Sequence, residues 1–265
     1  MLTRSHGLGN DYLVADPAEL PFSVTPERAR LLCDRHFGVG SDGLLLLDGN
    51  LGVRIFNPDG SEAEKSGNGL RIFGRWLYTT GRALSRQFTV QTRGGDAAVE
   101  IGDGQDVTVD MGKATFLSQP SGLVIDGQRL AVTALLVGNP HCVIFRDLLD
   151  VTELRRLGPL VETHPAFPRR TNVQFVHSLG KTSLELLIWE RGAGETQASG
   201  SSSCAAVAAA HRAGLVDREV TARMPGGELF IRIDADDKLW LRGPVEEVAT
   251  IHLSSDLIRR LQALP

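Results

Sequence analysis

The chain carries an internal repeat, which is the feature that most constrains its fold. The first copy runs over 53–67 and the second over 186–200. Each contains a strand-like segment, a glycine-containing turn, a glutamate, three residues and a Ser-Gly step that leads into an apolar helical segment. The serines of these steps, Ser66 and Ser199, are 133 residues apart in a chain of 265. Self-similarity at half the chain length is typical of duplication, with chance resemblance of two Ser-Gly turns as the alternative.

The rest of the chain is dominated by strand-like alternation, with few helices. Strands are expected within 88–92, 107–111, 172–176, 184–189, 230–233 and 239–241. Helices are expected at 25–35, about 70–78, about 203–212, and as short segments at 154–157 and 256–261. The helices near 70–78 and 203–212 have almost no polar face, which indicates burial. These patterns predict an α+β protein of two sheet-wrapped domains with one core helix each. Their expected ranges are 1–113 with 245–265, and 114–244.

Composition excludes several functional classes. The formal net charge is −4 without any run of Lys or Arg, so nucleic acid is not an expected partner. Apolar stretches are too short to span a membrane, and the start lacks an apolar signal region, so we expect a cytoplasmic protein without membrane association. Three widely spaced cysteines encode neither a disulfide framework nor a zinc site, and no metal is expected. The segment Gly38 to Gly43 has the glycine spacing of a dinucleotide-binding motif. It precedes a strand rather than a helix, so we do not interpret it as a dinucleotide site.

The Ser-Gly steps suggest anion binding. A Ser-Gly step entering a helix directs free backbone N–H groups and the positive helix end at one point, which suits a carboxylate or phosphate. Ser201 and Asn68 add polar donors beside the two steps. The alternative is plain helix capping by serine, which needs no ligand. His141 could be a base or a hydrogen-bonded loop residue, and Cys204 is expected to be a small core side chain.

Several motifs resemble the diaminopimelate epimerase family, within a wider superfamily that includes the proline racemases. The matching segments are His6-Gly-Leu-Gly-Asn-Asp-Tyr, Gly38-Val-Gly-Ser-Asp-Gly, Asn57-Pro-Asp-Gly-Ser-Glu-Ala-Glu, Gly67-Asn-Gly-Leu-Arg, Gly138-Asn-Pro-His, Thr171-Asn-Val and Glu190-Arg-Gly-Ala-Gly-Glu-Thr. The resemblance implies two pseudo-symmetric domains, each a curled, mostly antiparallel sheet or barrel around a central helix, with the active site between them. It also implies no cofactor and no metal.

In that family one thiol on each side of the substrate handles the α-proton of an amino acid. Carried over by position, the two proton-transfer residues here are Ser66 and Ser199, so serine stands at both thiol positions. The resemblance also implies a set of substrate-binding residues: Asn10, Asn57, Gly67, Asn68, Asn139, Asn172, Glu190, Arg191, Gly200 and Ser201. Glu190 and Arg191 could hold the amino and carboxylate groups, or form a local ion pair.

Serine is a poor replacement for a thiol in this chemistry. A thiol has a pKa of about 8.5, whereas an alkyl hydroxyl is nearer to water at about 15.7, a gap of roughly 7 units. Serine would need a separate base. Three interpretations stay open: an epimerase-type isomerase with altered proton chemistry, a catalytically silent amino-acid-binding protein, and an epimerase whose cysteines were replaced to trap a complex. Diaminopimelate is the default substrate by family, and exposed strand edges favour a homodimer.

Overall fold

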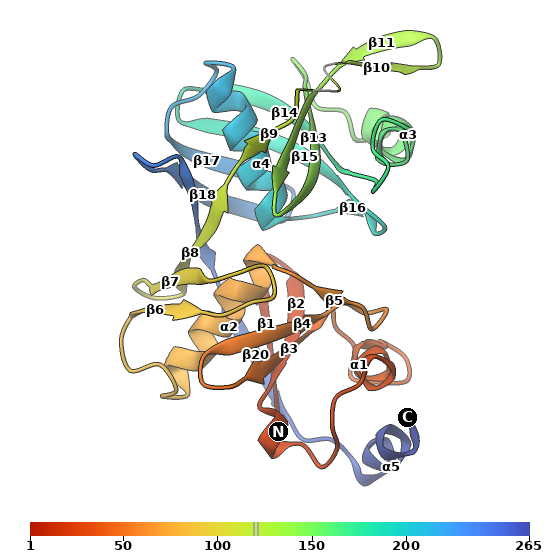
Figure 1. The fold of residues 1–265 in the computed structure, drawn as a ribbon, viewed down its shortest axis with the longest axis vertical. Coiled ribbons are helices and arrows are strands. Elements are labelled where there is room, and N and C mark those ends of the chain that lie inside the picture. The colour runs from red at the N-terminus through yellow and green to blue at the C-terminus, as the bar shows by residue number, and fades with distance from the viewer. Residues whose placement is uncertain (119, 121) are drawn as a thin grey trace. The chain divides into compact units, whose positions relative to one another are not determined.

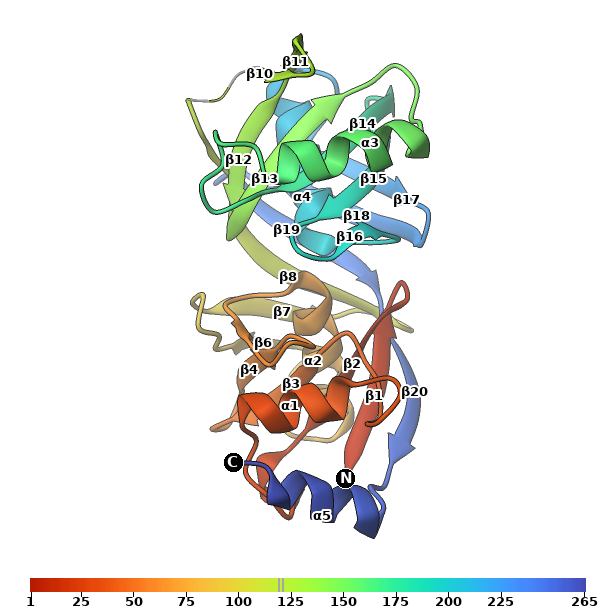
Figure 2. The ribbon, with the colours of Figure 1, turned by 90° about the vertical axis from the view of Figure 1, so that its right-hand side faces the viewer.

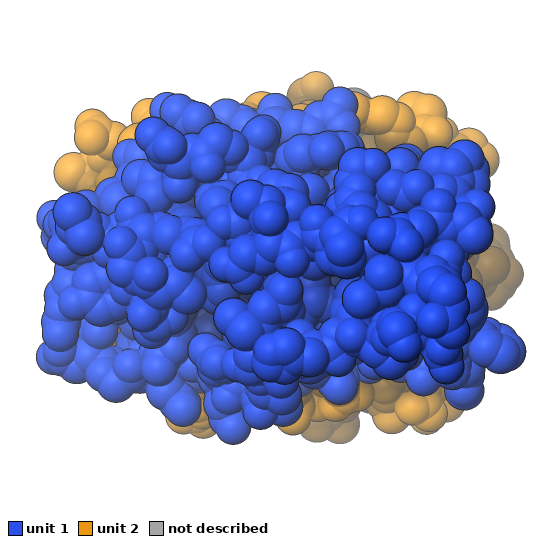
Figure 3. Space-filling view, turned by 90° about the horizontal axis from the view of Figure 1, so that it is seen from below, with its two compact units in different colours: residues 1–109, 243–265 blue, residues 110–242 orange. Residues whose placement is uncertain are grey.

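The computed structural model describes residues 1–118, 120 and 122–265, which divide into two compact units (Figures 1 and 3). Unit 1 comprises Met1–Val109 and Gly243–Pro265, and unit 2 comprises Asp110–Arg242. The chain leaves unit 1 along β8 (Asp106–Lys113) and returns along β19 (Lys238–Pro244). The sequence predicted that the chain passes from the first domain to the second after residue 113 and returns to the first at residue 245.

Unit 1 contains a six-stranded sheet in the order β20-β1-β2-β3-β4-β5 and an antiparallel run of β6, β7 and β8. Its strands are β1 (Leu2–Gly7), β2 (Asn10–Ala15), β3 (Leu44–Asp48), β4 (Gly52–Phe56), β5 (Glu62–Ala63), β6 (Gln87–Val90), β7 (Ala97–Ile101) and β20 (Glu246–Ile251). Its helices are the 3₁₀ turn η1 (Pro17–Glu19), α1 (Pro26–Cys33), α2 (Gly67–Thr79) and α5 (Ser255–Ala263). β20 pairs antiparallel with β1, so the chain returns to unit 1 after residue 242.

Unit 2 has the strand order β19-β18-β17-β15-β14-β13-β12-β9, with β16 beside β15 and a separate hairpin of β10 and β11. Its further strands are β9 (Thr115–Phe116), β10 (Gly122–Ile125), β11 (Gln128–Ala131), β12 (Thr133–Val137), β13 (Asn139–Phe145), β14 (Asn172–Gly180), β15 (Ser183–Glu190), β16 (Gly194–Thr196), β17 (Glu219–Met224) and β18 (Gly227–Ile233). Its helices are α3 (Val151–Glu162) and α4 (Gly200–Arg212).

The two units repeat one topology. In unit 1, the β1–β2 hairpin leads through α1 to β3, which lies parallel to β2, and then through antiparallel β4 and β5 into α2. In unit 2, the β12–β13 hairpin leads through α3 to β14, parallel to β13, and through β15 and β16 into α4. Asn10 and Asn139 each begin the second strand of the hairpin. The predicted duplication is therefore confirmed in the order and direction of the strands.

Each unit wraps its sheet around one buried helix, as the apolar patterns predicted (Figures 1 and 2). α2 packs against β1, β2 and β7, and α4 packs against β12, β13, β14 and β18. Both helices begin three residues earlier than predicted, at Gly67 and Gly200. The reason is that the serine before each glycine occupies the N-cap position, so the Ser-Gly step lies at the helix start itself. Glycine has low helix propensity and hides this boundary in the sequence.

A second apolar layer lies on the outer side of each sheet. In unit 1, Leu32 of α1 and Leu261 of α5 are fully buried in a cluster with Leu44 and Phe56. In unit 2, Leu154 and Val161 of α3 are buried against Phe175. α3 spans twelve residues, whereas only 154–157 was predicted. Gly158 and Pro159 conceal the helical pattern in its second half.

Candidate functional site

The start of α2 presents a capped serine in unit 1. Ser66 has extended backbone geometry (φ −138°, ψ 123°), and its Oγ accepts a hydrogen bond of 3.1 Å from the Gly69 N–H. The Tyr12 hydroxyl lies 3.2 Å from the same Oγ. Because helix geometry supplies no acceptor for the first backbone N–H groups, those of Gly67 and Asn68 point out of the helix start. The predicted residues Ser66, Gly67 and Asn68 therefore form one polar helix start.

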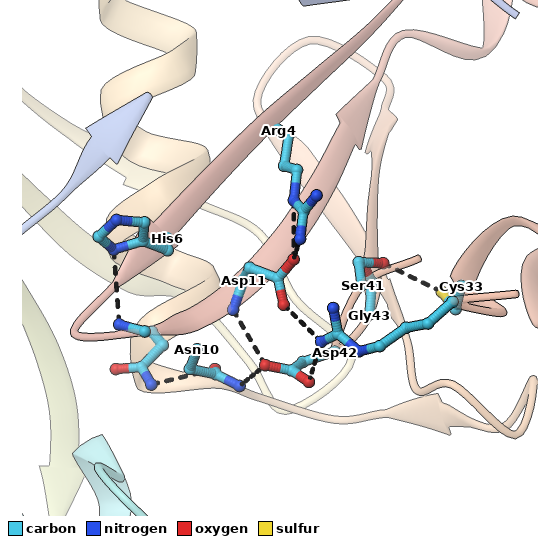
Figure 4. A network of polar contacts seen from close by, with 11 residues as sticks. Arg4, His6, Asn10, Asp11, Cys33, Ser41, Asp42 and Gly43 are labelled. Atoms are coloured by element: carbon cyan, nitrogen blue, oxygen red, sulfur yellow. Dashed lines mark hydrogen bonds and ion pairs between the residues drawn. The ribbon is translucent and has the colours of Figure 1, made fainter. Parts of the chain in front are cut away.

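A polar network holds the predicted residue Asn10 next to this helix start (Figure 4). Asn10 Nδ2 donates to Asp42 Oδ2 at 3.0 Å, and Asn10 Oδ1 accepts from Asn68 Nδ2 at 3.0 Å. Arg35 Nη2 lies 2.8 Å from both Asp42 Oδ1 and Asp11 Oδ1. The carboxylate of Asp42 thus fixes which way the Asn10 amide faces.

Two buried groups support that network. Burial raises the pKa of Asp11, but hydrogen bonds and charge from Arg35 and Arg4 outweigh it, so the pKa lies below its ordinary value. Arg71, fully buried on α2, donates to Asn68 Oδ1 and to the Pro244 carbonyl at 3.0 Å.

Asn57 lies apart from these contacts: its Nδ2 donates to Ser61 Oγ at 3.0 Å within a turn after β4.

The start of α4 in unit 2 differs from that of α2 in how its serine is bonded. Ser199 is 5% exposed and occupies the N-cap, but its side chain makes no capping hydrogen bond. Its carbonyl accepts from Ser203 N at 3.1 Å and from Ser203 Oγ at 2.8 Å. Gly200 and Ser201 follow Ser199 with N–H groups that have no acceptor in the helix.

A buried chain of side chains leads from α4 to Asn139. Gln174 Nε2 lies 3.0 Å from Ser202 Oγ and 3.1 Å from His141 Nδ1, while His141 Nε2 lies 2.7 Å from Asn139 Oδ1. His141 is part of strand β13 and 1% exposed, so its interpretation as a loop residue is wrong. Burial, aided by the charge of Arg191 and opposed by the Gln174 bond, lowers the pKa of His141 to about 3. The imidazole is neutral and both of its ring nitrogens are bonded, which disfavours a role as general base.

The turn that carries Glu190 and Arg191 is held by two buried side chains. Asn172, 5% exposed, accepts from the Arg191 N–H at 2.9 Å and donates to the Pro140 carbonyl at 2.9 Å. Glu162 of α3 accepts from the Gly192 N–H at 2.9 Å. The predicted residues Asn139, Asn172 and Arg191 are thereby linked, directly or through neighbours, in one part of unit 2.

Replacing Asn172 by leucine should destabilise the protein by about 2–4 kcal/mol, because two backbone groups lose their partner in a buried position. The measurement is urea denaturation followed by tryptophan fluorescence. Ser178→Ala, on the exposed end of the same strand, is the control and should change stability by less than about 0.5 kcal/mol. An Asn172→Leu protein as stable as the parent would show that Asn172 does not hold the turn.

The chain's own thiols do not replace those missing from the helix starts. Cys33, Cys142 and Cys204 are all buried. Burial raises the pKa of both Cys33 and Cys142 above the ordinary thiol value. Cys204 is fully buried in α4, as predicted for a core side chain.

Sequence reasoning did not single out Asp42, Arg35, Arg71, Gln174 or Glu162, which orient the predicted residues. Asp42 lies in a motif that was recognised, but its partner Asn10 is 32 residues away, so only the fold reveals the contact. Among residues 1–118, 120 and 122–265, no three His, Cys, Asp or Glu side chains are grouped to hold a metal ion. In the same part of the chain, no helix is long and apolar enough to cross a membrane.

The fold of this chain resembles those of solved racemase and epimerase structures. The fold matches a probable proline racemase from Agrobacterium radiobacter (TM-score 0.72, 15% identity, 96% of this chain and 93% of the other). It also matches a hydroxyproline epimerase from Agrobacterium vitis (TM-score 0.71, 15% identity, 94% and 90%). Two units of duplicated topology, each with a Ser-Gly helix start, thus have the fold of racemases and epimerases.

Sequence comparison then gives the family. The diaminopimelate epimerase model matches residues 2–117 and 133–248. Diaminopimelate epimerase 2 of Nostoc sp. is 44% identical, covering 96% of this chain and 95% of its own length. Diaminopimelate epimerase of Pelotomaculum thermopropionicum is 42% identical, covering 93% and 96%. The chain belongs to the diaminopimelate epimerase family and is an isomerase of the epimerase type.

Proposed function

We propose that this protein inverts the α-carbon of a small amino acid, with diaminopimelate as the substrate suggested by its relatives, and that Ser66 and Ser199 act on opposite faces of that carbon. The observation that carries this proposal is the matched pair of Ser-Gly helix starts, one in each unit of the duplicated fold. Family membership supports the reaction type, and no cofactor is invoked.

The binding half of the proposal rests on polar groups at both helix starts. Backbone N–H groups at a helix N-terminus suit a carboxylate, since they carry partial positive charge and lack internal acceptors. We assign substrate binding to the residues that the family resemblance marks: Asn10, Asn57, Gly67, Asn68, Asn139, Asn172, Glu190, Arg191, Gly200 and Ser201. Asp42 and Glu162 act behind them by orienting Asn10 and the turn at Arg191.

The catalytic half depends on proton transfer by hydroxyl groups. One face must take the α-proton, leaving the bonding electrons on carbon, and the other face must return a proton. A hydroxyl returns a proton readily to a carbanion, but it removes one poorly because its pKa is about 7 units above that of a thiol. We therefore expect slow turnover, limited by the step in which a serine acts as the base.

Removing either hydroxyl should lower α-hydrogen exchange by about 10²-fold or more, the usual contribution of a positioned acid or base. The measurement is loss of the α-hydrogen signal of diaminopimelate in heavy water with Ser66→Ala and Ser199→Ala. Ser254→Ala is the control, because Ser254 caps α5 as Ser66 caps α2 but is exposed and belongs to no predicted site. Exchange at the parent rate in both site variants would refute the proposal.

A second candidate function is binding of an amino acid without catalysis. It is favoured by the contacts at the two serines. Ser66 Oγ bonds the Gly69 N–H and the Tyr12 hydroxyl rather than an imidazole or a carboxylate, and Ser199 makes no capping bond. Calorimetric binding of diaminopimelate with no exchange of its α-hydrogen would establish this function.

A cytoplasmic location and a homodimer stay predictions. Light scattering would test whether the protein is a homodimer.

A further inference from the structure

The Tyr12 hydroxyl lies beside the proposed proton-transfer position of unit 1, and the proposed function does not use it. Its hydroxyl lies 3.2 Å from Ser66 Oγ, across 54 residues of sequence. Tyr12 is 7% exposed and lies on β2, two residues after Asn10. Since alternate residues of a strand face the same side, Tyr12 and Asn10 both face the start of α2.

The packing around the ring fixes the position of this hydroxyl. A Cβ added to Gly43 would lie 2.6 Å from Tyr12 Cε1 and 2.7 Å from the Phe56 carbonyl, so only glycine leaves room for the ring. A Cβ added to Gly69 would lie 3.2 Å from both Cβ and Oγ of Ser66. Two glycines therefore allow the phenol and the serine hydroxyl to approach each other.

The hydrogen-bonding capacity of Ser66 couples its state to that of Tyr12. A serine hydroxyl has one proton and two lone pairs, and the Gly69 N–H uses one lone pair. When Tyr12 is a protonated donor, the second lone pair is filled and the Ser66 proton is left to point at a ligand. When Tyr12 is a phenolate, it accepts the Ser66 proton and leaves a lone pair for a ligand. One proton thus switches Ser66 between acid and base.

We infer that Tyr12 is the proton acceptor behind Ser66, so that the two hydroxyls together act as the acid and base of unit 1. The inference rests on the proposed function. A phenol has an ordinary pKa of about 10, against about 15.7 for an alkyl hydroxyl, so the negative charge resides on Tyr12 rather than on Ser66. Tyr12 acts through Ser66 and is a positioning residue that also stores the proton.

The transfer conserves protons and electrons. The α-carbon–hydrogen bond breaks, its electron pair stays on the α-carbon, and the proton binds Ser66 Oγ. In the same step Ser66 passes its original proton to the Tyr12 phenolate, which becomes a phenol. In the reverse direction, the phenol returns a proton to Ser66, which protonates the carbon from the same face. Ser66 is unchanged in either direction.

Tyr12→Phe tests this inference because it keeps the ring and removes only the hydroxyl. In the Ser66 protein it should lower the rate of α-hydrogen exchange of diaminopimelate by about 10²-fold or more, with the calorimetric affinity changed by less than about three-fold. Tyr78→Phe, which removes the hydroxyl of the only other tyrosine, is the matched control and should keep the parent rate.

The same substitution is then made in a Ser66→Cys background. A thiol is itself more acidic than a phenol, so it does not need Tyr12 as an acceptor, and the loss from Tyr12→Phe should shrink to less than about five-fold. An equal loss in both backgrounds would show that Tyr12 has only a structural role and would overturn the inference. So would parent-level exchange in Tyr12→Phe, an outcome that leaves the proposed function intact. A parent protein that exchanges no α-hydrogen would refute the proposed function and the inference with it.

Discussion

Replacing both serines by cysteine, in Ser66→Cys together with Ser199→Cys, should raise the rate of diaminopimelate epimerisation by about 10³-fold or more. The pKa gap of about 7 units between an alkyl hydroxyl and a thiol corresponds to about 10 kcal/mol in the cost of forming the base. The helix ends offset little of this, because a helix N-terminus contributes about 2 kcal/mol at most to a nearby negative charge. The substitution exchanges one atom at each N-cap and leaves the polar networks around Asn10 and Asn172 in place.

Single-thiol variants separate the two steps of the reaction. Ser66→Cys with Ser199→Ala, and the converse pair, should each exchange the α-hydrogen of one stereoisomer without inverting it, because a lone thiol takes and returns the proton on one face. Ser254→Cys, at the exposed N-cap of α5, controls for the mere presence of a new thiol at a helix start. A folded double-thiol variant that binds diaminopimelate but does not epimerise it would contradict the proposed roles of Ser66 and Ser199.

Acidification should destabilise the protein through His141, by about 2 kcal/mol at about pH 5 and about 4 kcal/mol at about pH 3. Burial lowers the pKa of this imidazole from 6.5 to about 3 in the folded state. The unfolded chain therefore takes up a proton as the pH falls through about 6.5, while the folded protein does not until about pH 3. The stability that the neutral His141 contributes to the folded protein is present in full above about pH 6.5 and is lost as the pH falls toward 3.

The measurement is the free energy of unfolding in urea as a function of pH, compared between the parent protein and His141→Gln. The variant has no imidazole to titrate at this position, so its stability should fall less steeply below about pH 6.5, by about 1.4 kcal/mol per pH unit. His177→Gln, which removes a half-buried imidazole on neighbouring β14, is the control. Parallel pH profiles for the parent and His141→Gln would show that His141 titrates normally in the folded protein.

The duplication and the positions of both helix starts could be predicted from the sequence because their signals are local. A Ser-Gly step and the apolar run after it fix an N-cap and a buried helix within about a dozen residues. The same local reading placed Ser66 and Ser199 at matched points, and the motifs around them identified the family. The local patterns underestimated the length of α3, because Gly158 and Pro159 weaken the helical pattern in the sequence. Packing of α3 against the sheet compensates for their low helix propensity.

Only the tertiary structure decided the environments of these residues. Tyr12 and Ser66, or Asn10 and Asp42, meet because separate strands and loops converge on one helix end, and no local pattern encodes such a contact. The burial of His141, and hence its low pKa, likewise depends on which strands and helix cover it. Secondary structure follows from short-range dihedral preferences and apolar spacing, whereas hydrogen-bond partners and desolvation depend on the placement of distant segments to within an ångström.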